Sequence, residues 1–131
     1  KYALAVDDYT KAIDLNPGNH VFYSNRALCY IRLEQFGSAR EDADKCIELK
    51  PGYVKGYYRR ASANFALGKL KLSLLDYRRA KKIAPNDKDV QRKLQQSEKA
   101  YKIEKFSQAL AAPEEEIVPE YSKIVIEDII V

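Results

Sequence analysis

The sequence predicts an all-α fold, a solenoid of antiparallel helix pairs, and three observations support this prediction. Pro17, Pro51 and Pro85 are evenly spaced along the chain. Each proline closes a similar phrase, Ala-Ile-Asp-Leu-Asn-Pro, Cys-Ile-Glu-Leu-Lys-Pro and Ala-Lys-Lys-Ile-Ala-Pro in turn. Small and aromatic residues also recur at the same places within the period. A fixed period of about 34 residues is typical of helical repeat proteins, in which each unit buries its apolar face against its neighbours.

The recurring residues fall where the two helices of a unit, helix A and helix B, would touch. Repeat positions are numbered so that each proline stands at position 32. At the contact positions, small residues let the helix backbones approach closely, and aromatic residues fill the holes opposite them. This pattern resembles the tetratricopeptide repeat. Its residues are Tyr23 and Tyr57 at position 4, Ala27 and Ala61 at 8, Ala5, Ala39 and Ser73 at 20, Tyr9, Ala43 and Tyr77 at 24, and Ala12, Cys46 and Ala80 at 27.

The elements follow from this register in chain order. Residues 1–19 would give helix B of repeat one, because Lys1 falls at repeat position 16, and we expect helix A of that repeat to be missing from this chain. Pro-Gly pairs and a Leu-Gly-Lys turn would separate the later helices. The predicted units are repeat two over 20–53, with helices at 20–33 and 36–49, and repeat three over 54–87, with helices at 54–67 and 70–84.

A capping helix is predicted over residues 88–112, after Asn86 or Asp87 as its N-cap. Such a helix would cover the apolar face that the last repeat otherwise exposes. Its inward residues would be Val90, Leu94, Ser97, Tyr101 and Ile103, and its outer face would carry Lys88, Arg92, Lys93, Gln96 and Lys99. Residues 113–131, which are rich in glutamate and interrupted by two prolines, predict an acidic linker toward a further C-terminal domain.

Composition excludes several classes of protein. The 131 residues suit one domain, and no apolar run approaches the roughly 18 residues of a membrane span. Cys29 and Cys46 fall on helix faces, which predicts reduced thiols and a cytoplasmic protein, with the nucleus as a second compartment. His20 has no second ligand nearby in the sequence, so neither a metal nor another cofactor is expected.

The predicted concave surface is cationic. Residues 1–110 carry a formal charge of +9 and residues 111–131 a charge of −5. Helix A of each repeat lines the concave side of such a solenoid, and the i, i+3, i+4 rule selects its groove face. No acidic residue stands among the selected positions, so the groove should attract an extended anionic peptide. The groove face comprises Val21, Ser24, Asn25, Leu28, Ile31 and Arg32 in repeat two, and Lys55, Tyr58, Arg59, Ser62, Phe65 and Ala66 in repeat three.

Three of these residues resemble a more specific site. Asn25, Lys55 and Arg59 are similar to three of the five members of the carboxylate clamp of co-chaperones, whose other two members would belong to the missing helix. The resemblance implies binding of the C-terminal Glu-Glu-Val-Asp of the ninety- and seventy-kilodalton heat-shock chaperones. The candidate peptide-binding residues are Asn25, Arg32, Lys55, Arg59, Tyr58, Ser24, Leu28 and Phe65.

The run from Val54 to Lys69, together with Asn86-Asp-Lys-Asp89, is similar to the tetratricopeptide domains of the serine/threonine protein phosphatase 5 family. Arg32 aligns with a further basic groove residue of that family. The resemblance implies that this chain is the non-catalytic, autoinhibitory part of a phosphatase, with the chaperone tail and its own catalytic domain as partners.

Three alternatives stay open at this point. One is a scaffolding co-chaperone of the immunophilin or organising-protein kind. Another is nucleic-acid binding through the basic surface from Lys69 to Lys105, although the nearby aromatic residues are assigned to the core rather than to base stacking. The third is an enzyme, which the sequence does not favour because it contains no phosphate loop, nucleophile elbow or metallophosphatase motif.

Overall fold

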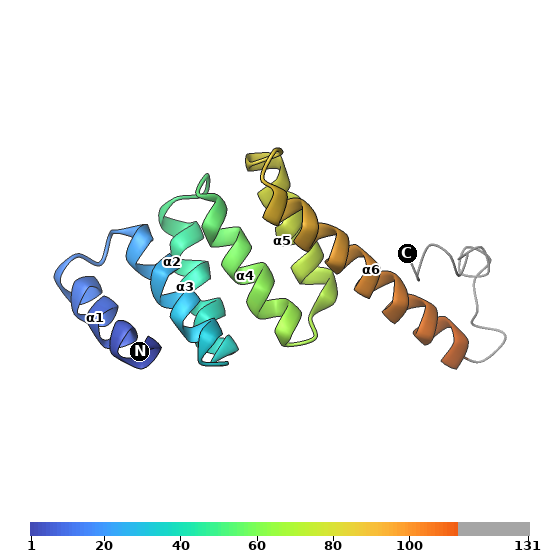
Figure 1. Ribbon diagram of the computed structural model, residues 1–131, viewed down its shortest axis with the longest axis horizontal. Coiled ribbons are helices and arrows are strands. Elements are labelled where there is room, and N and C mark those ends of the chain that lie inside the picture. Colours follow the sequence, from blue (N-terminus) through green and yellow to red (C-terminus); the bar gives the residue numbers. More distant parts are fainter. Residues whose placement is uncertain (113–131) are drawn as a thin grey trace.

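The computed structural model confirms an all-α fold (Figure 1). It describes residues 1–112, and the predicted acidic linker at 113–131 lies outside the described residues. Successive helices pack against each other along the chain, and α2 also contacts α4. Within residues 1–112, no helix combines the length and apolar character that crossing a membrane requires. The helices are α1 (Tyr2–Leu15), α2 (His20–Arg32), α3 (Phe36–Leu49), α4 (Val54–Ala66), α5 (Leu70–Ile83) and α6 (Lys88–Ala111).

Local capping explains where several helices begin and end. The side chain of Asn19 accepts a hydrogen bond from the backbone N–H of Val21 at the start of α2, and Asp87 accepts two such bonds at the start of α6. The turns after α2 and α4 use left-handed backbone at equivalent repeat positions, Glu34 (φ 58°) and Gly68 (φ 77°). Glycine adopts this conformation without the steric cost that a glutamate incurs.

Small residues form the contacts between helices. Seven small residues at the positions that the repeat period selects have no exposed surface: Ala27, Ala39, Ala43, Cys46, Ala61, Ser73 and Ala80. Gly56 also lets α4 approach α3, because a Cβ atom at this position would stand 2.9 Å from Ile47 Cγ1. Cys29 and Cys46 are buried free thiols.

A repeated ion-pair cluster fixes the register between units. Arg26 makes a bidentate pair with Asp42 at 2.7 Å and donates to Thr10 Oγ1 at 3.1 Å. Arg60, one repeat period later, pairs with Asp76 at 2.8 and 2.9 Å and with Asp44 at 3.0 Å. Each arginine thus joins its own helix to the following helix B and to helix B of the preceding repeat.

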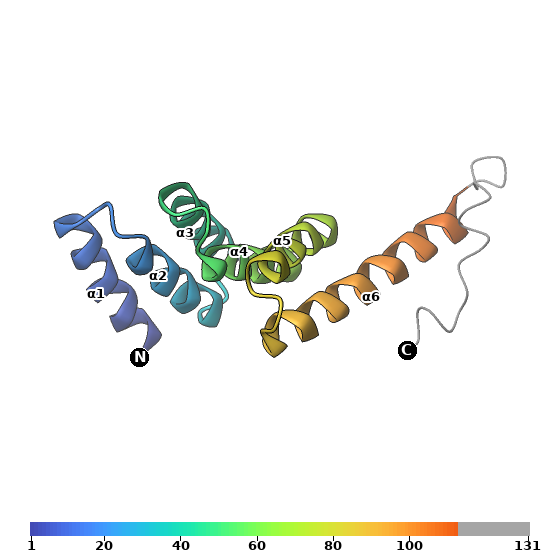
Figure 2. The same ribbon diagram turned by 90° about the horizontal axis from the view of Figure 1, so that it is seen from above.

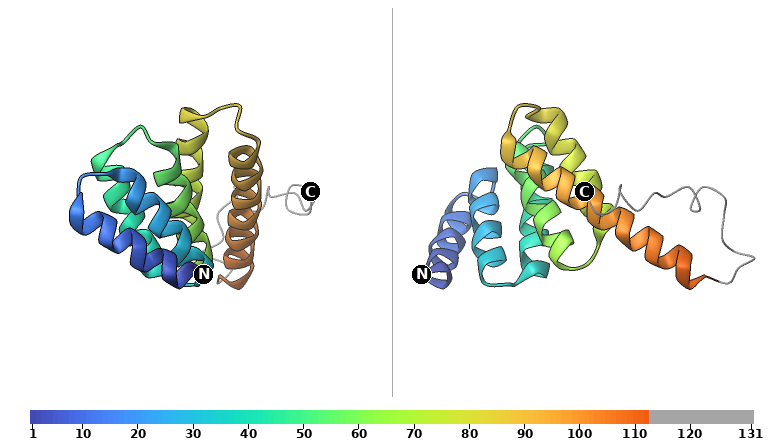
Figure 3. Two further views of the ribbon diagram at one scale, coloured as in Figure 1. Left: turned by 60° about the vertical axis from the view of Figure 1, so that its left-hand side comes forward. Right: turned by 45° about the vertical axis from the view of Figure 1, so that its right-hand side comes forward.

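Helix α6 covers one end of the stack and then runs beyond it (Figures 2 and 3). Val90, Leu94 and Ser97 are buried, and Tyr101 packs against the cluster around Tyr77, as the sequence predicts. The prediction that Ile103 faces inward is wrong, because its side chain is 43% exposed. The helix diverges from α5 toward its C-terminal end, so its inward stripe loses its packing partner there.

Candidate peptide-binding groove

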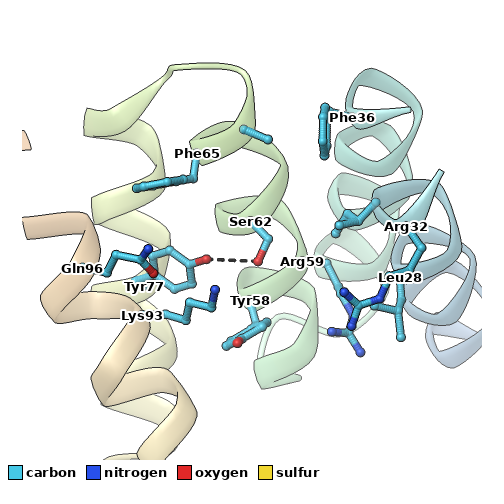
Figure 4. Close-up of a pocket in the computed structure, with 12 residues that line it drawn as sticks. Leu28, Arg32, Phe36, Tyr58, Arg59, Ser62, Phe65, Tyr77, Lys93 and Gln96 are labelled. Atoms are coloured by element: carbon cyan, nitrogen blue, oxygen red, sulfur yellow. Dashed lines mark hydrogen bonds between the residues drawn. The ribbon is translucent and has the colours of Figure 1, made fainter. Parts of the chain in front are cut away.

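The concave side contains a cavity of about 280 Å³ between α2, α4 and α6 (Figure 4). Helices α2 and α4 supply most of its lining, while α3, α5 and α6 close its ends. The cavity has both cationic and apolar walls. Its lining residues are Leu28, Ile31, Arg32, Phe36, Tyr58, Arg59, Ser62, Phe65, Ala66, Tyr77, Lys93 and Gln96.

Two tyrosines build a rigid, neutral wall in this cavity. The hydroxyl groups of Ser62 and Tyr77 are hydrogen-bonded at 3.0 Å, and the rings of Tyr58 and Tyr77 meet edge to face, with centroids 5.7 Å apart. Burial raises the pKa of Tyr77 to about 12, although the hydrogen bond with Ser62 acts in the opposite direction. The phenol of Tyr77 is therefore uncharged at neutral pH, and its buried ring supports the half-buried ring of Tyr58, which a ligand can contact.

Arg59 is the most buried cation of the groove. Its Nε–H is buried, and no acceptor for it exists among the described residues. Burial lowers the pKa of the guanidinium, and the nearby charge of Arg32 lowers it further. An arginine nevertheless stays protonated at neutral pH. A buried donor without a partner raises the free energy of the protein. An anionic ligand that accepts a hydrogen bond from Arg59 would remove this cost.

A second cavity of about 280 Å³ adjoins the first and shares Arg32, Tyr58 and Arg59 with it. Lys55 lines this second cavity, with Asp87 and Asp89 opposite. The prediction of a groove without acidic residues is therefore wrong. The two carboxylates lie at the beginning of α6, outside the helix A positions that the repeat register selects.

Most of the predicted site residues gather in these adjoining cavities. Arg32, Tyr58, Arg59, Leu28 and Phe65 line the first, and Lys55 lines the second.

Two predicted site residues lie differently. Asn25 is half-buried on α2 and lines neither cavity. Ser24 is fully buried, so the prediction that it contacts a peptide is wrong. Tyr58 occupies the equivalent position in repeat three and reaches the groove because its ring is long, whereas the short serine side chain stays between the helices.

The sequence interpretation also missed four lining residues: Phe36, Tyr77, Lys93 and Gln96. Two of them, Lys93 and Gln96, were predicted on the outer face of the capping helix, and this prediction is wrong. Figure 4 shows Lys93 extending from α6 toward α4. The repeat register could have identified both, because Lys93 follows Arg59, and Gln96 follows Ser62, by one full repeat period.

The lining of the groove combines cationic and apolar side chains. Among residues 1–112, no group of three or more histidine, cysteine, aspartate or glutamate side chains could hold a metal ion. The convergent cations suit carboxylates, and the phenylalanine, leucine and tyrosine side chains suit the apolar parts of a peptide.

Comparisons with known proteins agree with this architecture. Two models of the tetratricopeptide repeat match residues 8–41 and 54–87. The chain is 48% identical over 113 residues to serine/threonine-protein phosphatase 5 of Mus musculus, a match that covers 86% of this chain and 23% of that protein. The chain thus spans about a quarter of this relative's length.

Two solved structures resemble the chain closely. The first tetratricopeptide domain of Spaghetti (RPAP3), bound to the HSP90 peptide SRMEEVD, is 38% identical, with a TM-score of 0.72 and coverage of 85% of this chain and 81% of that one. The second such domain of human RPAP3, in complex with the HSP70 peptide SGPTIEEVD, is 28% identical, with a TM-score of 0.72 and coverage of 75% and 82%. The chain belongs to the tetratricopeptide repeat family.

Proposed function

We propose that this chain binds the acidic C-terminal peptides of heat-shock chaperones that end in Glu-Glu-Val-Asp. The observation that carries the proposal is the buried, unpartnered Nε–H of Arg59 in a concave groove that Arg32 and Lys55 also line. The two solved relatives bound to SRMEEVD and SGPTIEEVD support the same ligand class.

The arrangement accounts for recognition of a carboxylate. Lys55 and Arg59 stand one helical turn apart on α4, so their charged groups can converge on one ligand carboxylate. Asn25 on the neighbouring helix α2 lies outside both cavities, and in this proposal it would supply an amide donor to a part of the peptide that extends beyond them. Each charge-assisted hydrogen bond contributes about 1.5–3 kcal/mol. The apolar lining, which includes Leu28 and Phe65, suits the uncharged side chains of the peptide.

We propose that the whole protein is a serine/threonine phosphatase, of which this chain is the regulatory, non-catalytic part, with its own catalytic domain as a second partner. The 48% identity to a phosphatase 5 supports this role. A scaffolding co-chaperone is the second candidate, because the 38% identical domain of RPAP3 is also bound to an HSP90 peptide and comes from a protein that is not named as a phosphatase. We also propose a cytoplasmic location, with the nucleus as a second compartment, since two free thiols suit a reducing environment.

Calorimetric titration with SRMEEVD tests the binding proposal. We expect Lys55→Ala and Arg59→Ala each to weaken binding by about 1–3 kcal/mol, or about 5- to 150-fold, because each removes a charge-assisted contact. Lys81→Ala is the matched control, since it removes an exposed cation from α5 outside both cavities. Circular dichroism should show that all three variants stay folded. Unchanged affinity in both groove variants would reject the proposal.

A further inference from the structure

A separate groove of about 500 Å³ lies between α3 and α5, over α4. It shares no lining residue with the two cavities of the peptide-binding groove. The peptide-binding proposal therefore does not account for it. Its lining residues are Arg40, Asp44, Arg60, Asn64, Leu72, Leu75 and Asp76.

Repeat two shows which kind of side chain can lie beside the arginine that corresponds to Arg60. Tyr30 precedes Asn64 by one repeat period, and the guanidinium carbon of Arg26 lies 5.8 Å from the centre of its ring. Arg60 is the equivalent of Arg26, and its pair with Asp76 matches the pair of Arg26 with Asp42. Repeat three therefore keeps the oriented arginine but replaces the aromatic ring with a short amide.

The replacement leaves an unused hydrogen-bond acceptor in the groove. Asn64 is only 3% exposed, and its Oδ1 atom has no partner among the described residues. Leaving such a buried acceptor unsatisfied costs free energy, because the atom has lost its hydrogen bonds to water. A ligand that donates a hydrogen bond at this point would recover that cost.

The walls of the groove are also more apolar than the equivalent surface of repeat two. Leu72 and Leu75 are 50% and 49% exposed, whereas their equivalents in repeat two are the exposed polar residues Ser38 and Glu41. Two neighbouring leucines on one exposed helix face are suited to a contact with another apolar group. The groove thus offers apolar walls, an oriented cation and a buried acceptor at once.

We propose that this groove binds a tyrosine side chain presented by a partner protein. The ring would lie against Leu72 and Leu75 beside the guanidinium of Arg60, much as Tyr30 lies beside Arg26. The tyrosine hydroxyl would donate to Asn64 Oδ1, which favours tyrosine over phenylalanine. A guanidinium over an aromatic face is attractive, and the groove's volume is typical of a ligand site.

The experiment titrates N-acetyl-tyrosinamide into the 15N-labelled 131-residue chain and follows the amide signals. We expect saturable shifts at Asn64, Leu72 and Leu75. N-acetyl-phenylalaninamide should bind about fivefold more weakly, because it lacks the hydroxyl donor. N-acetyl-alaninamide should cause no saturable shift. Equal binding of the tyrosine and phenylalanine probes, or no saturable shift with either, would overturn the proposal.

Two variants locate the site. Asn64→Tyr supplies the missing ring from the chain itself and should abolish binding of the probe while leaving SRMEEVD binding unchanged. Leu75→Glu introduces the residue type of repeat two at an exposed position and should weaken probe binding even if the first variant does not fold. Leu4→Ser changes a 69% exposed leucine on α1 and serves as the control.

The same variants distinguish a partner protein from a second copy of this chain. Sedimentation should give the same mass for the natural chain and for Asn64→Tyr. A dimer of the natural chain that the variant dissociates would place a second copy in the groove and overturn the proposal. Probe shifts that persist in both Asn64→Tyr and Leu75→Glu would overturn it as well.

Discussion

Asp89 stands on the same cavity as Lys55 and Arg59, and its carboxylate opposes the charge that attracts an acidic ligand. It also pairs with Arg92 at 2.9 Å on the exposed surface. We therefore expect Asp89→Asn to strengthen SRMEEVD binding by at most about 1 kcal/mol, because exposed charge pairs contribute about 0–1 kcal/mol. Calorimetry would measure the change, and Asp14→Asn on α1 would control for net charge. Weaker binding in Asp89→Asn would show that the carboxylate helps to hold the peptide.

Tyr77 links the groove to the pH dependence of stability. Its pKa is raised to about 12 in the folded protein by burial, compared with an ordinary value of 10. The folded state thus holds this proton more tightly than the unfolded state does. Its contribution to the free energy of unfolding is fully present below pH 10. It is lost as the pH rises from 10 through about 12, and the total loss is about 2–3 kcal/mol.

Urea unfolding at pH 9 and pH 11.5 would measure this effect. Cys46, whose pKa burial raises to about 11, and other groups titrate over the same range, so the comparison needs Tyr77→Phe as its control. We expect the variant to lose less stability than the natural protein between these two pH values. An equal loss in both proteins would contradict the assignment to Tyr77.

At the scale of elements, Arg60 joins α4 to both α3 and α5 through Asp44 and Asp76. Its pair with Asp76 is largely shielded, since the two side chains are 28% and 10% exposed. We expect Arg60→Ala to lower the free energy of unfolding by about 2–3 kcal/mol, because it removes charged hydrogen bonds at a partly buried site.

The matched control for Arg60 is Lys45→Ala, which breaks an exposed pair with Glu48 within one helix. Exposed pairs contribute about 0–1 kcal/mol, so this variant should hardly change the urea midpoint. Equal effects of Arg60→Ala and Lys45→Ala would mean that the arginine does not hold the repeats in register.

The boundaries of the elements could be predicted from the sequence because their causes are local. Asn19 and Asp87 cap helices through their own side chains, and the Pro-Gly pairs identify turns from the residue types alone. The predicted helix starts at residues 20, 36, 54 and 70 agree with the structure.

The wrong predictions concern residues whose environment depends on how one helix packs against another. Ser24 and Tyr58 share a repeat position, yet only the longer side chain reaches the groove. The helical pattern of α6 alone places Lys93 on the outer face, whereas the repeat register places it in the groove, where the structure has it. Ile103 continues an apolar stripe, but α6 has diverged from α5 by that point and leaves it exposed.

At the scale of the whole molecule, contacts between successive helices extend from α1 to α6, while the peptide-binding groove draws residues from α2 through α6. A ligand in the groove would therefore touch repeats two and three and the capping helix at once. Anything that binds only the folded state also stabilises it. A ligand bound in the groove should therefore stabilise the packing of these helices against one another.

Recognition of the peptide's terminal carboxylate can be measured by calorimetric titration with Met-Glu-Glu-Val-Asp, repeated with the same peptide amidated at that carboxylate. We expect micromolar binding that is lost on amidation, because the convergent cations of the groove recognise the carboxylate. Equal affinity for the two peptides, or no binding of either, would contradict it.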